Sequence, residues 1–277
     1  MWEQKRLLIW GKTYPEFSKK YYETVCTGAL DADTGRLLRI YPVQLRYMKE
    51  PFRVFDWIDA NVERNPSDPR PESYRIQQDS IKVVGHIDTK HEGWAERAKL
   101  VLSPTSLFPS VPTLLEAQAQ HGTSLGLVKP RSIRFYAKRC APEERTEWEA
   151  KREEARRQKD LFVDADTVTK ELHFIPVRYR AKFLCADASC TTEHDMTILD
   201  WGVYVLSWKL FLERGSPQAD KGVLDKLTHT ADESRADSYF FLGNMAAHPN
   251  SFMVVGLFCP PRGKEMASAK QLGLFQT

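Results

Sequence analysis

Long apolar runs and a paired cysteine framework are both missing from this sequence of 277 residues. No run approaches the roughly 20 apolar residues that a membrane-spanning helix needs, so we expect no membrane contact. The early apolar run, residues 7–10, is too short for a signal peptide, so we expect a cytoplasmic protein. The five cysteines are odd in number and scattered, which argues against a disulfide scaffold and favours reduced thiols.

The common enzyme signatures are missing as well. The sequence has no glycine-rich phosphate loop, no dinucleotide-binding glycine pattern and no nucleophile elbow. The paired motifs of zinc deaminases are also absent. A metal-dependent nuclease stays open as an alternative, because four aspartates can in principle gather around a divalent ion: Asp31, Asp33, Asp56 and Asp59. The alternative is that these four aspartates simply lie on the surface or in turns, since carboxylates are mostly exposed.

What the chain does have is the composition of a folded protein. It is 42% hydrophobic, 11% aromatic and 28% charged, which excludes general disorder. The net charge of +3 permits binding to nucleic acid without requiring it.

The apolar patterning predicts a mainly β protein with α insertions, built as small barrels or sandwiches. Expected strands cover residues 6–10, 24–31, 36–43, 56–62, 81–88, 132–137, 238–242 and 252–259, with a long hairpin loop at 243–250. Expected helices cover 113–120, 207–214 and 223–230. Residues 143–159 are rich in Glu, Arg, Lys and Ala, which predicts an exposed helix or a helical linker.

A short internal repeat is also present. The segment from Ile40 to Tyr47 precedes an Asp-Trp pair at Asp56, and the segment from Ile175 to Arg180 precedes another at Asp200. Each copy holds a Pro-Val followed by basic residues and tyrosine, and we expect each Asp-Trp to open a strand. The repeat is either a coincidence or the trace of a duplicated small β domain with an insertion in its second copy.

Several landmarks together resemble the dual OB-containing domain family of prokaryotes. They include Lys12-Thr13-Tyr14-Pro15, Arg39-Ile40-Tyr41-Pro42, Asp56-Trp57-Ile58, Asp200-Trp201 and Pro249-Asn250-Ser251-Phe252. The resemblance implies two OB-like barrels in tandem and a nucleic-acid role, with defence against mobile DNA and other defence-system subunits as its setting. We accordingly expect a first domain at 1–140, a charged helical linker at 141–165, a second domain at 166–261 and a flexible tail at 262–277.

A cluster of metal-ligand residues lies in the expected second domain. Cys185, Cys190 and His194 offer two thiolates and an imidazole at close spacing, the ligands that structural zinc prefers. We therefore predict one structural zinc ion. Its fourth ligand must come from a distance, and the candidates are Cys140, His173, His248 and Cys259. The alternative interpretation is two small buried residues beside a surface histidine.

Basic and aromatic residues alternate in several stretches, a pattern typical of proteins that hold phosphates with cations and stack bases on rings. A half-buried strand with an aromatic core face gives the same pattern. The predicted contacts with DNA, single-stranded by preference, or with RNA are Arg46, Tyr47, Arg134, Tyr136, Arg178, Arg180 and Lys182. A protein-interaction module without nucleic-acid contact is the remaining alternative.

The C-terminal residues form a different motif. Gln271, Leu272, Leu274 and Phe275 resemble the peptide with which bacterial polymerases and repair proteins hold the β sliding clamp. Two apolar anchors and an orienting glutamine suit a small pocket on a partner. The sequence therefore predicts a clamp-binding tail, unless these residues pack on their own domain.

Overall fold

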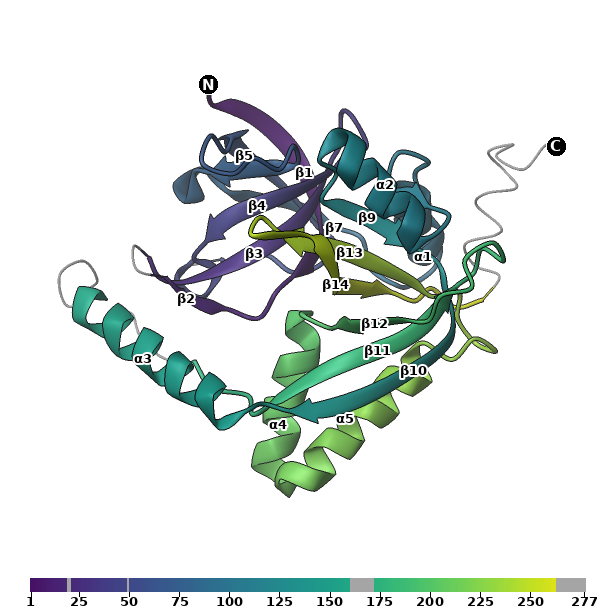
Figure 1. Cartoon of the computed structure of the whole chain (residues 1–277). Helices are drawn as coiled ribbons and strands as arrows, with labels where there is room; N and C mark the ends of the chain where they lie inside the picture. Colours follow the sequence, from purple (N-terminus) through teal and green to yellow (C-terminus); the bar gives the residue numbers. More distant parts are fainter. Residues whose placement is uncertain (19–20, 49, 160–171, 263–277) are drawn as a thin grey trace.

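The computed structural model describes residues 1–18, 21–48, 50–159 and 172–262 (Figure 1). The protein is mainly β, with 41% strand and 29% helix, as the patterning predicts. Among the described residues, no helix is long and apolar enough to cross a membrane. The predicted tail residues Gln271, Leu272, Leu274 and Phe275 lie outside the described part of the chain.

The N-terminal strands form a closed barrel. Its elements are β1 (Glu3–Lys12), β3 (Tyr22–Asp31), β4 (Leu37–Val43), β5 (Asp56–Arg64) and β6 (Ser73–Ile76). They are joined in the order β1-β3-β4-β6-β5, and β5 pairs back with β1 to close the ring. The contact between β4 and β6 is parallel and the other four contacts are antiparallel. The short β2 (Glu16–Ser18) and β7 (Lys82–His86) extend β3 and β5, and α1 (Gly93–Val101) follows.

Alternation along β5 explains how this barrel fills. Ile58, Ala60 and Val62 are buried while their neighbours are half-exposed, because successive side chains point to opposite faces of a strand. The inward residues join Leu7 and Ile9 of β1 in one apolar cluster. The barrel interior is therefore a packed core.

The second half contributes more strands and most of the helices. In chain order they are β8 (Leu107–Phe108), α2 (Val111–His121), β9 (Leu125–Val128), β10 (Pro130–Arg139), α3 (Pro142–Lys159), β11 (Val177–Cys185), β12 (His194–Thr197), α4 (Trp201–Arg214), α5 (Ser216–Thr230), β13 (Tyr239–Met245) and β14 (His248–Phe258). Helices α4 and α5 lie side by side below the β10–β11–β12 sheet in Figure 1.

The strand order of the first barrel recurs here. β9 and β10 are separated by Lys129 alone and together act as a first strand, pairing with β13 through β9 and with β11 through β10. β11 pairs with β12, and β13 pairs with β14, all antiparallel. A single parallel bridge from Ile198 to Val254 links the end of β12 to β14. The third and fifth strands of each half are therefore in parallel contact: β4 with β6 in the first half, and β12 with β14 in the second.

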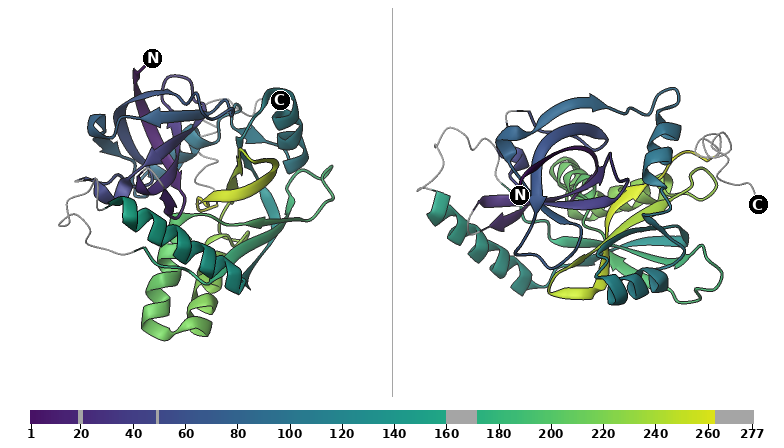
Figure 2. Two further views of the ribbon diagram at one scale, coloured as in Figure 1. Left: turned by 60° about the vertical axis from the view of Figure 1, so that its left-hand side comes forward. Right: turned by 90° about the horizontal axis from the view of Figure 1, so that it is seen from above.

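The two halves share a core. One apolar cluster combines Leu8 and Trp10 of β1 with Leu127 of β9 and Phe241 of β13. The rings of Trp10 and Phe241 stack with centroids 4.1 Å apart and an interplanar angle of 10°. The right-hand view of Figure 2 shows the yellow C-terminal strands lying directly beside the purple N-terminal ones.

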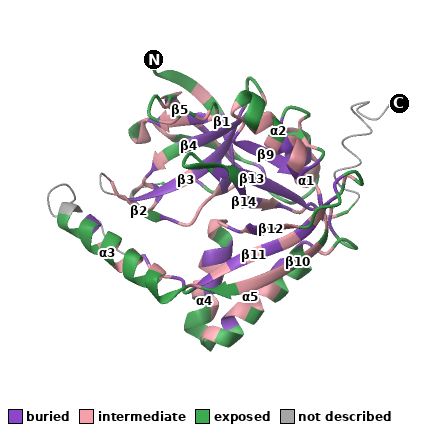
Figure 3. Ribbon diagram, viewed as in Figure 1, coloured by how far each residue is buried: buried purple, intermediate pink, exposed green. Residues whose placement is uncertain are grey.

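Helix α3 confirms the charged helix predicted at 143–159. It is more than a linker, because it also packs against the first half of the chain. Most of its side chains are exposed (Figure 3). Trp148, however, packs between Phe17 of β2 and Phe174, at centroid distances of 5.2 and 5.7 Å. The helix therefore reaches from the second half back to the first.

Four features of the structure differ in detail from the sequence expectations. Trp201 opens helix α4 and not a strand, because the Asp200 carboxylate caps the helix by accepting from the Val203 amide at 3.2 Å. The two copies of the predicted repeat also differ in their position in the strand order. Ile40 lies in β4, the third strand of the first barrel, whereas Val177 opens β11, which acts as the second strand of the second half. Residues 107–139, expected in the first domain, pair their strands with the second half. The long loop expected at 243–250 is a tight turn at 246–247 between two long strands.

Candidate functional site

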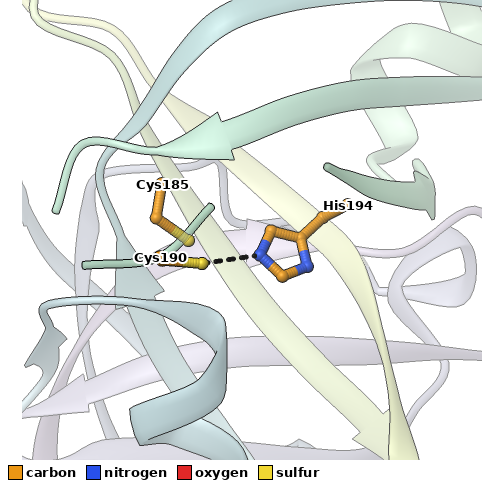
Figure 4. Close-up of side chains that lie close together, drawn as sticks. All are labelled: Cys185, Cys190 and His194. Atoms are coloured by element: carbon orange, nitrogen blue, oxygen red, sulfur yellow. Dashed lines mark hydrogen bonds between the residues drawn. The ribbon is translucent and has the colours of Figure 1, made fainter. Parts of the chain in front are cut away.

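Three metal-ligand side chains converge at the turn between β11 and β12. Cys185 ends β11, Cys190 lies in the turn and His194 begins β12. Their ligand atoms all lie within 4.8 Å of one another (Figure 4). The structure thus brings together the three residues that the sequence proposed, and this group can hold a metal ion.

Local hydrogen bonds shape the turn that presents Cys190. The Asp187 carboxylate accepts from the Ser189 amide at 2.9 Å, and the Asp187 carbonyl accepts from the Cys190 amide at 3.2 Å. An aspartate that bonds the backbone two residues on is a common turn former. The fold of the turn leaves Cys190 Sγ 3.3 Å from His194 Nε2.

The surroundings suit a bound cation with soft ligands. Cys185 and Cys190 are buried, and the Val111 amide at the start of α2 donates to Cys185 Sγ at 3.3 Å. Such outer hydrogen bonds commonly orient metal ligands. Burial lowers the pKa of His194, whereas it raises the pKa of the Cys185 thiol to about 11, so a metal ion must displace the thiol proton when it binds. The imidazole is therefore neutral at pH 7, which is the form that binds a metal.

None of the expected fourth ligands joins this group: Cys140, His173, His248 and Cys259. Cys140 Sγ lies 3.7 Å from the Ile175 carbonyl, and the His173 ring stacks on Trp208 at 3.9 Å. Within the described ranges, the site offers three protein ligands. Zinc sites with three protein ligands leave a coordination position open for water or another ligand.

The aspartate cluster required by the nuclease alternative does not form: Asp31, Asp33, Asp56 and Asp59 make no common metal group in the described part of the chain. Asp31 pairs with Lys5 at 3.1 Å, and Asp59 pairs with Arg6 at 2.8 Å. Asp56 lies 2.6 Å from His86. Strand pairing sends Asp31 and Asp59 to separate cations, so spacing along the sequence was misleading.

Five of the predicted nucleic-acid contacts share one face of the β10–β11–β12 sheet: Arg134, Tyr136, Arg178, Arg180 and Lys182. Arg134 is paired across the strands with Lys182, and Tyr136 with Arg180. The opposite side of β11 is buried among the core residues. We call this outward surface, together with Lys138, the cationic face.

Acidic side chains partly neutralise the cationic face. Asp195 of β12 accepts from Tyr136 Oη at 2.6 Å and from Arg180 Nε at 2.9 Å. Glu193 lies 3.6 Å from Arg134 and 3.8 Å from Lys182. Glu144 pairs with Arg178 and is the third acid beside the cationic face. The face has five cations, and five minus three leaves a net charge of two positive charges.

The other two predicted contacts do not belong to this face. Arg46 lies in the first barrel, where its Nε is 3.1 Å from Oε1 of the buried Glu23. Burial raises the pKa of Glu23 to about 7, against the opposing effect of Arg46. The side chain of Tyr47 is not among those described.

Sequence reasoning missed two contributors to these sites. Lys138 lies on the cationic face beside Arg178, and its place in the basic stretch at 131–139 is a signal that was available. The Val111 amide is a backbone donor some seventy residues before its thiol, so no residue pattern could have revealed it.

Two family models match the chain. The first is described as a domain of unknown function (DUF8758) and matches residues 3–103. The second is described as a domain of unknown function (DUF8757) and matches residues 106–277, which is more than half of the chain. No curated protein matches.

Proposed function

The chain belongs to the DUF8757 family, and for this member we propose that the cationic face binds single-stranded nucleic acid, DNA by preference. The observation that carries the proposal is the gathering of Arg134, Lys138, Arg178, Arg180 and Lys182 around Tyr136 on one sheet. Cations that follow a backbone, with a ring for stacking, are what sequence-tolerant single-strand binders use.

Strand order supports this proposal. A five-stranded barrel closed by a parallel contact between its third and fifth strands is the arrangement we assign to an OB-like fold in both halves. OB folds bind oligonucleotides on the face of their second and third strands. In the second half those strands are β11 and β12, which carry Arg180, Lys182 and Thr197.

The metal in this proposal is zinc, held by Cys185, Cys190 and His194. Two thiols and a neutral imidazole fit Zn²⁺ better than Mg²⁺ or Ca²⁺, which take oxygen ligands. Its role is structural: the ion ties the end of β11 to the start of β12, the strands that carry the cationic face. A hydrolytic role is not part of the proposal.

The test is a titration of fluorescent single-stranded DNA at several salt concentrations. Affinity is expected to fall as salt rises, with a slope of about −0.7 per neutralised phosphate. Lys138→Glu should weaken binding and make the slope shallower by about 0.7. Lys226→Glu makes the same charge change at an exposed position of α5 and serves as the control.

Two outcomes count against the proposal. Undetectable binding of DNA or RNA at low salt would favour the protein-interaction alternative. Equal losses in Lys138→Glu and Lys226→Glu would mean that net charge alone drives the contact.

The tail adds a tether to the same proposal. Gln271, Leu272, Leu274 and Phe275 would bind a bacterial sliding clamp and keep the cationic face near replicating DNA. This part rests on the sequence motif, and the cytoplasmic, defence-linked setting rests on the family resemblance. A peptide of residues 262–277 titrated against the clamp tests it directly.

A further inference from the structure

The tyrosine in the middle of the cationic face is held by its hydroxyl. Tyr136 Oη donates to the Asp195 carboxylate, whose two oxygens lie 2.6 and 2.8 Å away. The same hydroxyl accepts from Arg180 Nε at 2.9 Å. The ring is therefore fixed at both ends, by the backbone of β10 at one and by its hydroxyl at the other.

Arg180 belongs to this support. Each of its three guanidinium nitrogens donates to a protein oxygen: Nε to Asp195 Oδ1 at 2.9 Å, Nη1 to Thr197 Oγ1 at 2.6 Å and Nη2 to the Asp195 carbonyl at 3.0 Å. Strand register makes this possible, because Arg180 is paired with Tyr136 on one side and with Thr197 on the other. Arg180 keeps 25% of its side chain exposed, against 65% for Arg134. A phosphate at Arg180 would have to displace contacts that the protein already makes.

Stability alone does not account for this network. It lies on an exposed surface, where an ion pair contributes little to the free energy of unfolding. Holding a long arginine side chain in one geometry also costs conformational entropy. What the contacts do achieve is a ring with a set orientation, which a ligand then need not order when it binds.

Exposed cations lie on both sides of the fixed ring. Arg134 and Lys138 are two residues before and after Tyr136 on β10, roughly 7 Å away along the strand in each direction. Lys182 Nζ lies 5.9 Å from the ring centroid, at the limit of a cation–π contact, so a base can displace it. The order along β10 is cation, ring, cation, which suits one base between two phosphates of a single strand.

We propose that Tyr136 is the base-stacking platform of the cationic face, and that Arg180 and Asp195 are positioning residues that fix its ring. This inference rests on the proposed function and divides the work among cations that the sequence does not distinguish. Arg134 and Lys138 attract the backbone of the strand, and one base stacks on the ring between them. Arg180 acts through the ring and does not contact phosphate.

The test is a double-mutant cycle between Tyr136→Leu and Arg180→Lys, with binding of a single-stranded oligonucleotide as the measurement. Tyr136→Leu should weaken binding about tenfold, as removal of a stacking ring does. Arg180→Lys keeps the charge but cannot reproduce the three planar contacts, so binding should weaken about threefold. The double variant should bind as Tyr136→Leu does, because Arg180 has no effect once the ring is gone.

A fluorescent base reports the stacking itself. The probe is an oligonucleotide with one 2-aminopurine among abasic positions, so that only this base can stack on the ring. Its fluorescence should be quenched on binding to the unmodified protein, less in Arg180→Lys and not in Tyr136→Leu. Arg6→Lys is the matched control and should leave binding and quenching unchanged. Arg6 lies in the first barrel, where two of its nitrogens donate to Asp59 at 2.8 and 2.9 Å.

Asp195→Ala tests the support by a second route, independent of how Arg180→Lys folds. This change makes the cationic face more positive by one charge, so charge alone predicts tighter binding. A loosened ring predicts weaker quenching of the bound probe. Tighter binding with undiminished quenching would show that Asp195 only neutralises charge, and would refute its positioning role.

The outcomes separate this inference from the proposed function. If the losses caused by Tyr136→Leu and Arg180→Lys add up in the double variant, Arg180 contacts the strand itself and its positioning role is refuted. If Tyr136→Leu binds as tightly as the unmodified protein, the ring is not the platform, while binding at the cationic face stands. If the unmodified protein binds no oligonucleotide at all, the proposed function itself fails.

Discussion

Replacing Cys190 by serine should remove the metal from the turn between β11 and β12. Serine preserves the size of the side chain but supplies a hydroxyl where zinc favours a thiolate. Two protein ligands, Cys185 and His194, would then remain in a group that begins with three. The protein is expected to retain about one zinc per chain before the change and almost none after it.

The size of the stability effect follows from mass action and from the shortness of the bridged segment. An ion present at 100 times its dissociation constant stabilises the folded state by about 2.7 kcal/mol. For a chain of this size that is a loss of about 5–10 °C in melting temperature. The ligands span only positions 185 to 194, so little loop entropy is constrained and the barrel should remain folded without the ion.

The assay combines elemental analysis with thermal unfolding, in reducing buffer without chelator. Cys140→Ser is the control, because Cys140 is a half-buried thiol of the same half whose Sγ faces the Ile175 carbonyl and lies outside the ligand group. It should keep its zinc.

The zinc proposal would fail on either of two results. One is less than a tenth of an equivalent of zinc in the unmodified protein. The other is a melting temperature that changes neither when a chelator is added nor in Cys190→Ser. An ion that ties β11 to β12 must contribute to their stability.

Three further predictions address other parts of the molecule. Glu23 has its pKa raised to about 7 by burial, so the folded state holds its proton more tightly than the unfolded state, and stability should fall as pH rises from about 4.5 to 7. Glu23→Gln should flatten that slope in denaturant titrations across this range, and an unchanged slope would exclude Glu23 as its source. Trp148→Ala should expose α3 to limited proteolysis while the sheets stay resistant, because Trp148 supplies the ring contact of α3 with Phe17. Unchanged protection of α3 would contradict this. In clamp titrations with a peptide of residues 262–277, replacing Leu274 and Phe275 by alanine should abolish micromolar binding, and equal affinity of both peptides would refute the motif.

Local patterns predicted the elements that depend on local physics. The helix at α3 follows from its Glu, Arg, Lys and Ala content, and β5 follows from its strict alternation. The three metal ligands lie within ten positions, so their spacing alone brought them together. Five of the residues predicted to contact nucleic acid lie together on the cationic face, because alternation places every second residue of β10 and β11 on one side.

Other features depend on contacts between distant parts of the chain. Asp200 and Trp201 resemble a strand opening, but the Asp200 carboxylate caps a helix instead. Arg46 has the sequence surroundings of a phosphate contact, yet its side chain lies against the buried Glu23. Asp31, Asp56 and Asp59 have partners on neighbouring strands that no spacing along the chain reveals.

The stack of Trp10 on Phe241 has a consequence for how such a chain can evolve. The two family matches meet between residues 103 and 106, but the apolar cluster crosses that line and includes Leu8, Leu127 and Phe258. Neither half can be inherited or recombined alone without leaving aromatic surface open to water and to aggregation. The two halves are therefore inherited as one module, and a substitution at Trp10 is expected to require a compensating change at Phe241.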